Sequence, residues 1–196
     1  MQKLSRPVEP IGLASRRRTY IGSPSQDIAW KRFDKSEVRK ELKKAQNNLC
    51  AYCEVVLTNA TRIDHFKPKK LNYALTFDWD NLVLSCDEKD SCDNKKGGKF
   101  EDYWVNPYST DPVGMFKFYS DGQIEGQSTD AENIIIDFGL DCPNLEAKRK
   151  GVLKTLESNI SFLIEFPDAL EAYLKSEEAV MFPTAYKQII EKTIGA

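Results

Sequence analysis

The chain has 196 residues, of which 41 % are hydrophobic, and its formal net charge is −2. This hydrophobic content is enough to build a buried core and excludes wholesale disorder, and the charge differs from the basic balance of free-standing nucleic-acid-binding domains. Because the chain has no run of about 18 apolar residues and no apolar stretch at its start, we expect no transmembrane helix, no secretory signal and a cytoplasmic location.

The N-terminal segment, residues 1–26, contains three prolines and two glycines and shows little periodicity, which predicts an extended arm. A helix is predicted next, because Asp34 and Glu37 have the spacing of a capping box. Four apolar residues then recur on one helical face: Val38, Leu42, Ala45 and Leu49. This helix leads directly to Cys50.

The segment around the single histidine, His65, predicts two strands and a helix. A β-hairpin is predicted over residues 54–66, with its turn at residues 58–60. Residues 81–84 form a short segment of buried character, and a short helix is predicted from Asp93 onward. The expected local order is therefore strand, strand, helix.

The second half of the chain predicts a hairpin followed by helices. A hairpin is expected over residues 116–125, because an Asp-Gly turn pair lies between two short runs of apolar character. Helices are predicted over residues 129–140 and 144–166, and a proline stops the second one. Two shorter helices are expected near residues 168–176 and 183–193.

These elements predict the α+β fold class and three parts of the chain. Residues 1–26 form the arm, residues 27–105 form a core around the histidine, and residues 106–196 form the hairpin and helical region. The arm and the C-terminal helices are the candidates for contact with a partner, or they only cover the core.

Four of the five cysteines occur as two pairs, Cys50-x2-Cys53 and Cys86-x5-Cys92. In a reducing compartment, paired thiols favour metal binding over disulfides. Four thiolates suit a tetrahedral structural zinc ion, although the second spacing is longer than the usual two to four residues. The alternative is four unrelated buried cysteines.

Asp64 and His65 are the candidate catalytic pair. A neutral imidazole takes a proton from water near neutral pH, and a carboxylate is the oxygen ligand that magnesium prefers. Phosphodiester hydrolysis needs both functions. Because neighbours on a regular strand point to opposite faces, the strand must end or bulge here for both groups to serve one phosphate.

Three further polar residues are candidates for the same site. Asn81 either orients His65 and fixes its loop or is an ordinary turn asparagine. Asp93 and Asn94 follow the last thiol at a predicted helix start, where they either complete a magnesium site or cap the helix.

Basic residues flank this candidate site and are assigned to the substrate: Lys67, Lys69 and Lys96. The alternative for each is an ordinary solvated face. Because these basic residues are local and the whole chain is acidic, we expect a partner to supply much of the affinity for a polyanion such as nucleic acid.

Taken together, these motifs resemble the HNH endonuclease family: Cys50-x2-Cys53, Asp64-His65, Asn81-Leu82 and Cys92-Asp93-Asn94-Lys95-Lys96. The resemblance implies a ββα-metal core stapled by a zinc site of four cysteines, with one catalytic Mg²⁺ or Mn²⁺. It implies that His65 is the general base and that Asn81 supports the loop. It assigns Asp64 and Asp93 to the catalytic cation, with Asn94 as a rival for the second position.

Within this family, the chain is similar to the nuclease subunits of Septu and Septu-like retron anti-phage systems. The similarity rests on Lys3-Leu4-x-Arg6-Pro7, Cys50-Ala51-Tyr52-Cys53-Glu54 and Thr76-Phe77-Asp78-Trp79-Asp80-Asn81-Leu82, with the late hairpin and the closing helices. It implies an ABC-type ATPase subunit as partner, and such a partner would also explain why this chain has no P-loop motif of its own. DNA is the favoured substrate, and the alternatives are an RNA-cleaving (transfer RNA) nuclease and a non-catalytic zinc-stapled adaptor.

Overall fold

The computed structural model describes residues 1–20, 23, 25–166, 168 and 181–194. Its helices and strands in chain order are α1 (Ile11–Tyr20), α2 (Gln26–Arg32), α3 (Ser36–Ala45), β1 (Arg62–His65), the 3₁₀ helices η1 (Tyr73–Phe77) and η2 (Trp79–Asn81), β2 (Leu82–Ser85), α4 (Cys92–Lys96), β3 (Phe116–Phe118), β4 (Ile124–Gly126), α5 (Thr129–Phe138), α6 (Pro143–Glu165) and α8 (Pro183–Ile194).

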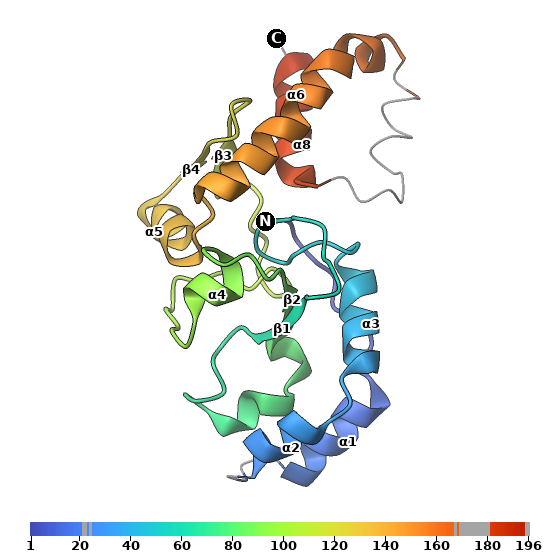
Figure 1. The fold of residues 1–196 in the computed structure, drawn as a ribbon, viewed down its shortest axis with the longest axis vertical. Coiled ribbons are helices and arrows are strands. Elements are labelled where there is room, and N and C mark those ends of the chain that lie inside the picture. The colour runs from blue at the N-terminus through green and yellow to red at the C-terminus, as the bar shows by residue number, and fades with distance from the viewer. Residues whose placement is uncertain (21–22, 24, 167, 169–180, 195–196) are drawn as a thin grey trace.

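The molecule is elongated, and its two ends come from different halves of the chain (Figure 1). Helices α1 and α2 lie at one end, α6 and α8 lie side by side at the other, and β1, β2 and α4 lie between them. None of the helices in the described ranges combines the length and apolar character needed to cross a membrane.

The expectation of an extended arm is wrong for residues 11–20, which form α1. Pro10 directly precedes this helix, where a missing N–H and a fixed φ do no harm, so the proline starts the helix instead of preventing it. The backbone N–H of Ala14 donates to the Pro10 carbonyl over 3.0 Å, and Leu13 is fully buried. Burial of Leu13 packs α1 against the core, a tertiary contact that the composition of this segment did not predict.

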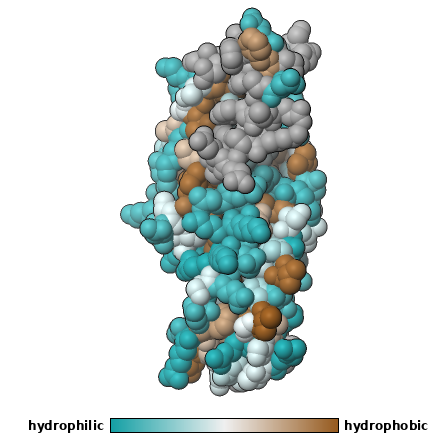
Figure 2. All heavy atoms as spheres, turned by 90° about the vertical axis from the view of Figure 1, so that its right-hand side faces the viewer, coloured by the Kyte–Doolittle hydropathy of each residue, from teal (hydrophilic) through white to brown (hydrophobic). Residues whose placement is uncertain are grey.

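Helix α3 confirms the predicted apolar stripe, because Val38 and Leu42 are fully buried. Asp34 accepts from the backbone N–H of Ser36 over 3.0 Å at the start of this helix. The outer side of the molecule near α3 is mostly hydrophilic, with hydrophobic side chains in small separate groups (Figure 2).

The predicted hairpin over residues 54–66 is wrong. β1 pairs antiparallel with β2 instead, with Arg62 opposite Ser85 and His65 opposite Leu82. Residues 54–57 turn back on the preceding chain, since Cys50 N–H donates to the Val55 carbonyl over 2.8 Å. β2 is buried along its whole length and therefore needs a partner inside the core. The helix after β2, α4, starts at Cys92, so the order strand, strand, helix is present.

The C-terminal half confirms the hairpin of β3 and β4 and the helices α5, α6 and α8. Gly122 has φ +94° in the hairpin turn, and a Cβ there would lie 2.3 Å from the Glu146 carbonyl oxygen, so α6 packs on bare backbone. The helix expected near residues 168–176 lies, apart from residue 168, outside the described residues. Packed aromatic rings join both halves into one core, with the Phe138 ring centroid 4.7 Å from those of both Tyr52 and Trp104.

Candidate functional site

The four paired thiols gather into one buried cluster. Their sulfur atoms all lie within 4.8 Å of one another, with 3.7 Å between Cys50 and Cys92 and between Cys53 and Cys86. These separations are far longer than a disulfide, whereas a tetrahedral metal with bonds of about 2.3 Å to sulfur has edges of about 3.8 Å. The cluster therefore confirms the prediction that these cysteines could hold a metal such as zinc.

The electrostatics of the cluster favour a bound cation. Burial raises the pKa of the Cys53 and Cys92 thiols well above their usual range. Burial acts in the same direction on Cys50, but hydrogen bonds from the three other thiols outweigh it and hold the pKa of Cys50 well below its usual range. The backbone N–H of Cys86 also donates to Cys50 Sγ over 3.3 Å. The Cys50 side chain is therefore favoured as a thiolate, which is the form that binds a divalent cation.

The long Cys86-x5-Cys92 loop is held in place by the C-terminal half. Glu88 in this loop binds Asn144 and Lys148 of α6. Gly139 lies against the loop so closely that a Cβ there would be 2.2 Å from the Asp90 carbonyl oxygen. The extra residues are therefore packed against α5 and α6 and do not prevent both sulfurs from pointing inward.

Asp64 points from β1 toward α4, and its carboxylate is fully engaged. Lys96 Nζ donates to both carboxylate oxygens over 2.7 and 2.6 Å, and the Tyr52 hydroxyl donates over 2.5 Å. Burial raises the pKa of Asp64 to about 7, although the Lys96 ammonium opposes this. The candidate metal ligand is thus a buried carboxyl that a proton, an ammonium or a metal cation can neutralise.

His65 lies on the other face of β1, as the alternation of a regular strand requires. Its ring meets the Trp30 ring edge-on with centroids 4.8 Å apart, and the side chain is buried. His65 Nε2 lies 3.0 Å from the Thr76 carbonyl oxygen. Since a carbonyl only accepts, Nε2 must carry the hydrogen, which leaves Nδ1 as the basic nitrogen. Burial lowers the pKa of His65 to about 4, so the imidazole is neutral.

Asp93 and Asn94 have different surroundings. The Asp93 carboxylate pairs with Arg62 over 3.7 Å, and its negative charge is one of the causes of the raised pKa of Asp64. Asn94 donates to the Glu88 carbonyl over 2.9 Å and accepts from Arg62, so it serves the long loop between the cysteines. Among the residues described, the thiol cluster is the one group of three or more potential ligands close enough to hold a metal. Asp64, His65 and Asp93 do not converge in this way.

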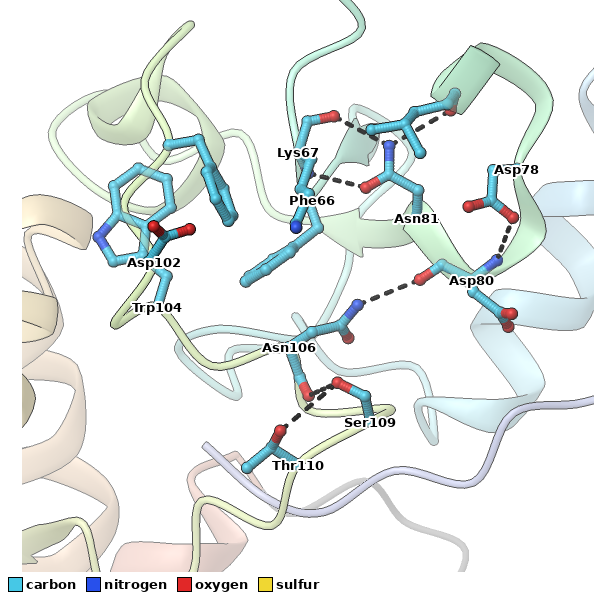
Figure 3. A pocket seen from close by; sticks show the side chains of 12 residues that line it. Phe66, Lys67, Asp78, Asp80, Asn81, Asp102, Trp104, Asn106, Ser109 and Thr110 are labelled. Atoms are coloured by element: carbon cyan, nitrogen blue, oxygen red, sulfur yellow. Dashed lines mark hydrogen bonds between the residues drawn. The ribbon is translucent and has the colours of Figure 1, made fainter. Parts of the chain in front are cut away.

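Asn81 fixes the loop that follows His65. Its side-chain oxygen accepts from the Lys67 N–H over 2.7 Å, and its side-chain nitrogen donates to the Lys67 carbonyl over 2.9 Å and to the Leu75 carbonyl (Figure 3). Asn81 also borders an open cavity of about 410 Å³ whose wall includes Phe66 and Phe100.

The three lysines assigned to the substrate are placed differently. Lys67 Nζ lies 4.6 Å from the centre of the Phe100 ring, and Lys69 Nζ pairs with Asp27 over 2.6 Å. Lys96 is only 1 % exposed and also donates to the His65 carbonyl over 2.8 Å, so its burial contradicts a direct contact with a phosphate backbone.

Two contributors were missed from the sequence. Trp30 covers His65, and Tyr52 binds Asp64. Tyr52 stands between the first two cysteines, which is the one signal that could have marked it. Nothing local marks Trp30, since α2 reaches His65 only through the tertiary fold.

No family model matches the chain. Two curated proteins are similar to it, and both are named Septu protein PtuB. The protein of Bacillus mycoides (strain KBAB4) is 27 % identical over an alignment of 196 positions, and the match covers 83 % of this chain and 65 % of that protein. The protein of Bacillus thuringiensis is 30 % identical over an alignment of 106 positions, and the match covers 50 % of this chain and 40 % of that protein. The chain thus spans less than two thirds of either relative, and the matches support a PtuB-like relationship.

Proposed function

We propose that the protein is the nuclease subunit of a Septu-type anti-phage defence complex, a metal-dependent HNH endonuclease that hydrolyses phosphodiester bonds of nucleic acid. The two PtuB relatives support the defence role. The observation offered for the nuclease activity is the hydrogen bond between His65 Nε2 and the Thr76 carbonyl, which leaves Nδ1 as the basic nitrogen. DNA is the favoured substrate, and the proposed partner is a PtuA-like, ABC-type ATPase.

His65 is arranged to act as the general base. The Thr76 carbonyl holds the Nε2–H tautomer, so Nδ1 keeps the lone pair that takes a proton from the attacking water. The same carbonyl stabilises the imidazolium that results. The lowered pKa makes the base weak in the free protein, and an approaching phosphate anion raises the pKa toward neutrality.

Asp64 and Asp93 are the residues that would hold the catalytic Mg²⁺ or Mn²⁺, which would neutralise charge on the phosphate. Their carboxylates are hard oxygen donors and fit such a cation by chemistry. Lys96 occupies both Asp64 oxygens in the structure, so binding a cation requires Lys96 to give up at least one of them. Arg62 contacts both Asp93 and Asn94, but Asn94 is the weaker candidate because its amide is neutral and also donates to the Glu88 carbonyl.

The charge distribution favours nucleic acid at the N-terminal end. Residues 1–46 contain twelve Lys and Arg against five Asp and Glu, whereas residues 101–196 contain eight against seventeen. Lys35 extends this positive end to the site, since its Nζ lies 5.1 Å from the centre of the Trp30 ring that covers His65. We assign Lys35, Lys67 and Lys69 to the phosphate backbone and the acidic end to the partner.

Access to His65 requires a change in structure, because its side chain is only 8 % exposed beneath α2. This burial fits a nuclease that its ATPase partner keeps inactive until triggered. It equally favours the second candidate function, a zinc-stapled adaptor without catalysis, in which Asp64 and His65 are only core residues. A nuclease specific for RNA is the remaining alternative within the same fold.

The decisive experiment incubates the purified complex of this chain and its ATPase partner with plasmid DNA and with total RNA. Magnesium, manganese and ATP are each supplied or omitted. We expect metal-dependent cleavage by the wild type and none by His65→Ala, while Lys187→Ala on the far α8 cleaves normally. Equal zinc content and melting temperature in all three confirm that the fold is kept. Cleavage by His65→Ala at the wild-type rate would remove the assigned base, and no cleavage under any condition would favour the adaptor.

A further inference from the structure

Arg149 of α6 is a buried cation with too few partners. Its side chain is 1 % exposed. Nε donates to the Gly122 carbonyl over 2.7 Å, but Nη2 is buried without a hydrogen-bond partner. In the described part of the chain, no carboxylate forms a salt bridge with this guanidinium. A buried charge of this kind is costly unless an opposite charge lies near it.

The cavity that Arg149 lines contains the candidate for that opposite charge. Two phenyl rings flank the guanidinium, with centroids 6.0 Å away for Phe118 and 5.8 Å away for Phe182. Arg149 also lines a small cavity together with Cys53 and Glu54. The cavity volume of about 10 Å³ is room for roughly one water molecule.

Glu54 is not the counter-ion, because other groups already use its carboxylate. Its Oε1 pairs with the buried amino group of Met1 over 2.9 Å, and its Oε2 accepts from the Thr184 N–H over 2.9 Å. Tyr52 also lines the cavity, but its hydroxyl donates to Asp64. Cys53 is the acidic group that remains, and it belongs to the thiol cluster.

A tetrathiolate zinc centre has a formal charge of −2, since four thiolates surround one divalent ion. Such a buried dianion needs a positive neighbour in a medium of low dielectric constant. Among the described residues, the fully buried long cationic side chains are Lys96 and Arg149, and Lys96 is committed to Asp64. Arg149 is therefore the buried cation left for the thiol cluster.

We propose that Arg149 is the counter-cation of the metal-loaded thiol cluster and acts on Cys53 directly or through one water in their shared cavity. Arg149 is a positioning residue, and it makes metal retention depend on α6. Burial lowers the pKa of Arg149, and Cys53 is the strongest of the acidic neighbours that oppose this. Cys142, Glu146 and Asp141 act in the same direction but more weakly. The inference rests on the cluster holding a metal and is independent of the nuclease activity.

The test compares three variants of the full chain loaded with zinc. Arg149→Met removes the charge but keeps an unbranched apolar side chain, Arg149→Lys keeps the charge, and Lys150→Met removes an exposed charge from the next position of the same helix. Metal release to a coloured chelator is followed over time. We expect release from Arg149→Met to be at least about tenfold faster than from the wild type, as for other residues that support metal ligands. Arg149→Lys should stay within about threefold, and Lys150→Met should be unchanged.

Cobalt substitution adds a readout that a packing defect would not move. The sulfur-to-cobalt charge-transfer band reports the charge around the thiolates, so it should shift in Arg149→Met and return toward the wild-type position in Arg149→Lys. If Arg149→Met does not fold, the Arg149→Lys band and release rate decide, since the proposal requires both to stay near wild type. Unchanged release and spectrum in a folded Arg149→Met, or a Lys variant as impaired as the Met variant, would overturn the proposal.

Discussion

Replacement of Lys96 by Met tests the arrangement around Asp64 most directly. Lys96 Nζ makes three hydrogen bonds, two to the Asp64 carboxylate and one to the His65 carbonyl, and both ionic side chains are buried. Removal of one partner of such a pair leaves an uncompensated buried charge and costs about 3–5 kcal/mol. We therefore expect Lys96→Met to lower the free energy of unfolding by that amount at about pH 8.5, which lies above the pKa of about 7 that Asp64 has in the wild type.

The cost should fall in acid, and the direction follows from Asp64. Its folded pKa of about 7 already lies above the ordinary value of 3.8, and the loss of Lys96 raises it further. A carboxyl whose folded pKa is raised loses stability as pH rises through that value, because the unfolded chain releases its proton earlier. At about pH 6 Asp64 carries a proton in the variant, so only hydrogen bonds of about 1–2 kcal/mol in total are missing.

Urea unfolding of the zinc-loaded protein, followed by tryptophan fluorescence, measures both values. Lys95→Met is the matched control, because Lys95 is exposed on the same short helix and should change stability by less than about 0.5 kcal/mol. Adding Asp64→Asn to Lys96→Met should recover about 2 kcal/mol at the higher pH, since the double variant buries no charge. A loss that is equal at both pH values, with no recovery in the double variant, would refute the buried ion pair.

Three further predictions concern the histidine, its loop and the thiols. The unfolding free energy of the wild type should fall by up to about 3 kcal/mol on acidification from pH 6.5 to 4, because the imidazole binds a proton in the unfolded chain before it does so in the folded one. His65→Gln should remove this pH dependence. An equal loss in the variant would contradict burial of a neutral His65. Asn81→Ala should release the loop at Lys67, seen as faster amide hydrogen exchange there at unchanged zinc content, whereas unchanged exchange would place the restraint elsewhere. Cys92→Ser should lower the unfolding free energy by several kcal/mol, and so should removal of the metal by a chelator. Equal melting temperatures with and without metal, measured by calorimetry, would exclude a stabilising ion.

The thiol cluster was predictable because its information is local. The paired spacing between the cysteines is a property of the chain itself, and the structure brings all four buried sulfurs together. The late hairpin was predictable for a similar reason, since the Asp-Gly pair and Gly122 with positive φ specify a turn within a few residues. The helices α3, α5 and α6 follow from apolar periodicity in the same way.

The sequence by itself therefore determined which residues gather around the thiols, but it did not determine what the neighbouring groups face. The direction of the Asp64 and His65 side chains depends on the pairing of β1 with β2, which lie seventeen or more positions apart in the chain. That pairing turns the carboxyl toward Lys96 and the imidazole toward Trp30, and it buries a lysine that sequence position alone assigned to the substrate. Residue type and spacing encode local conformation, whereas the partner of each buried charge is decided by contacts between distant segments, and these exist only in the folded chain.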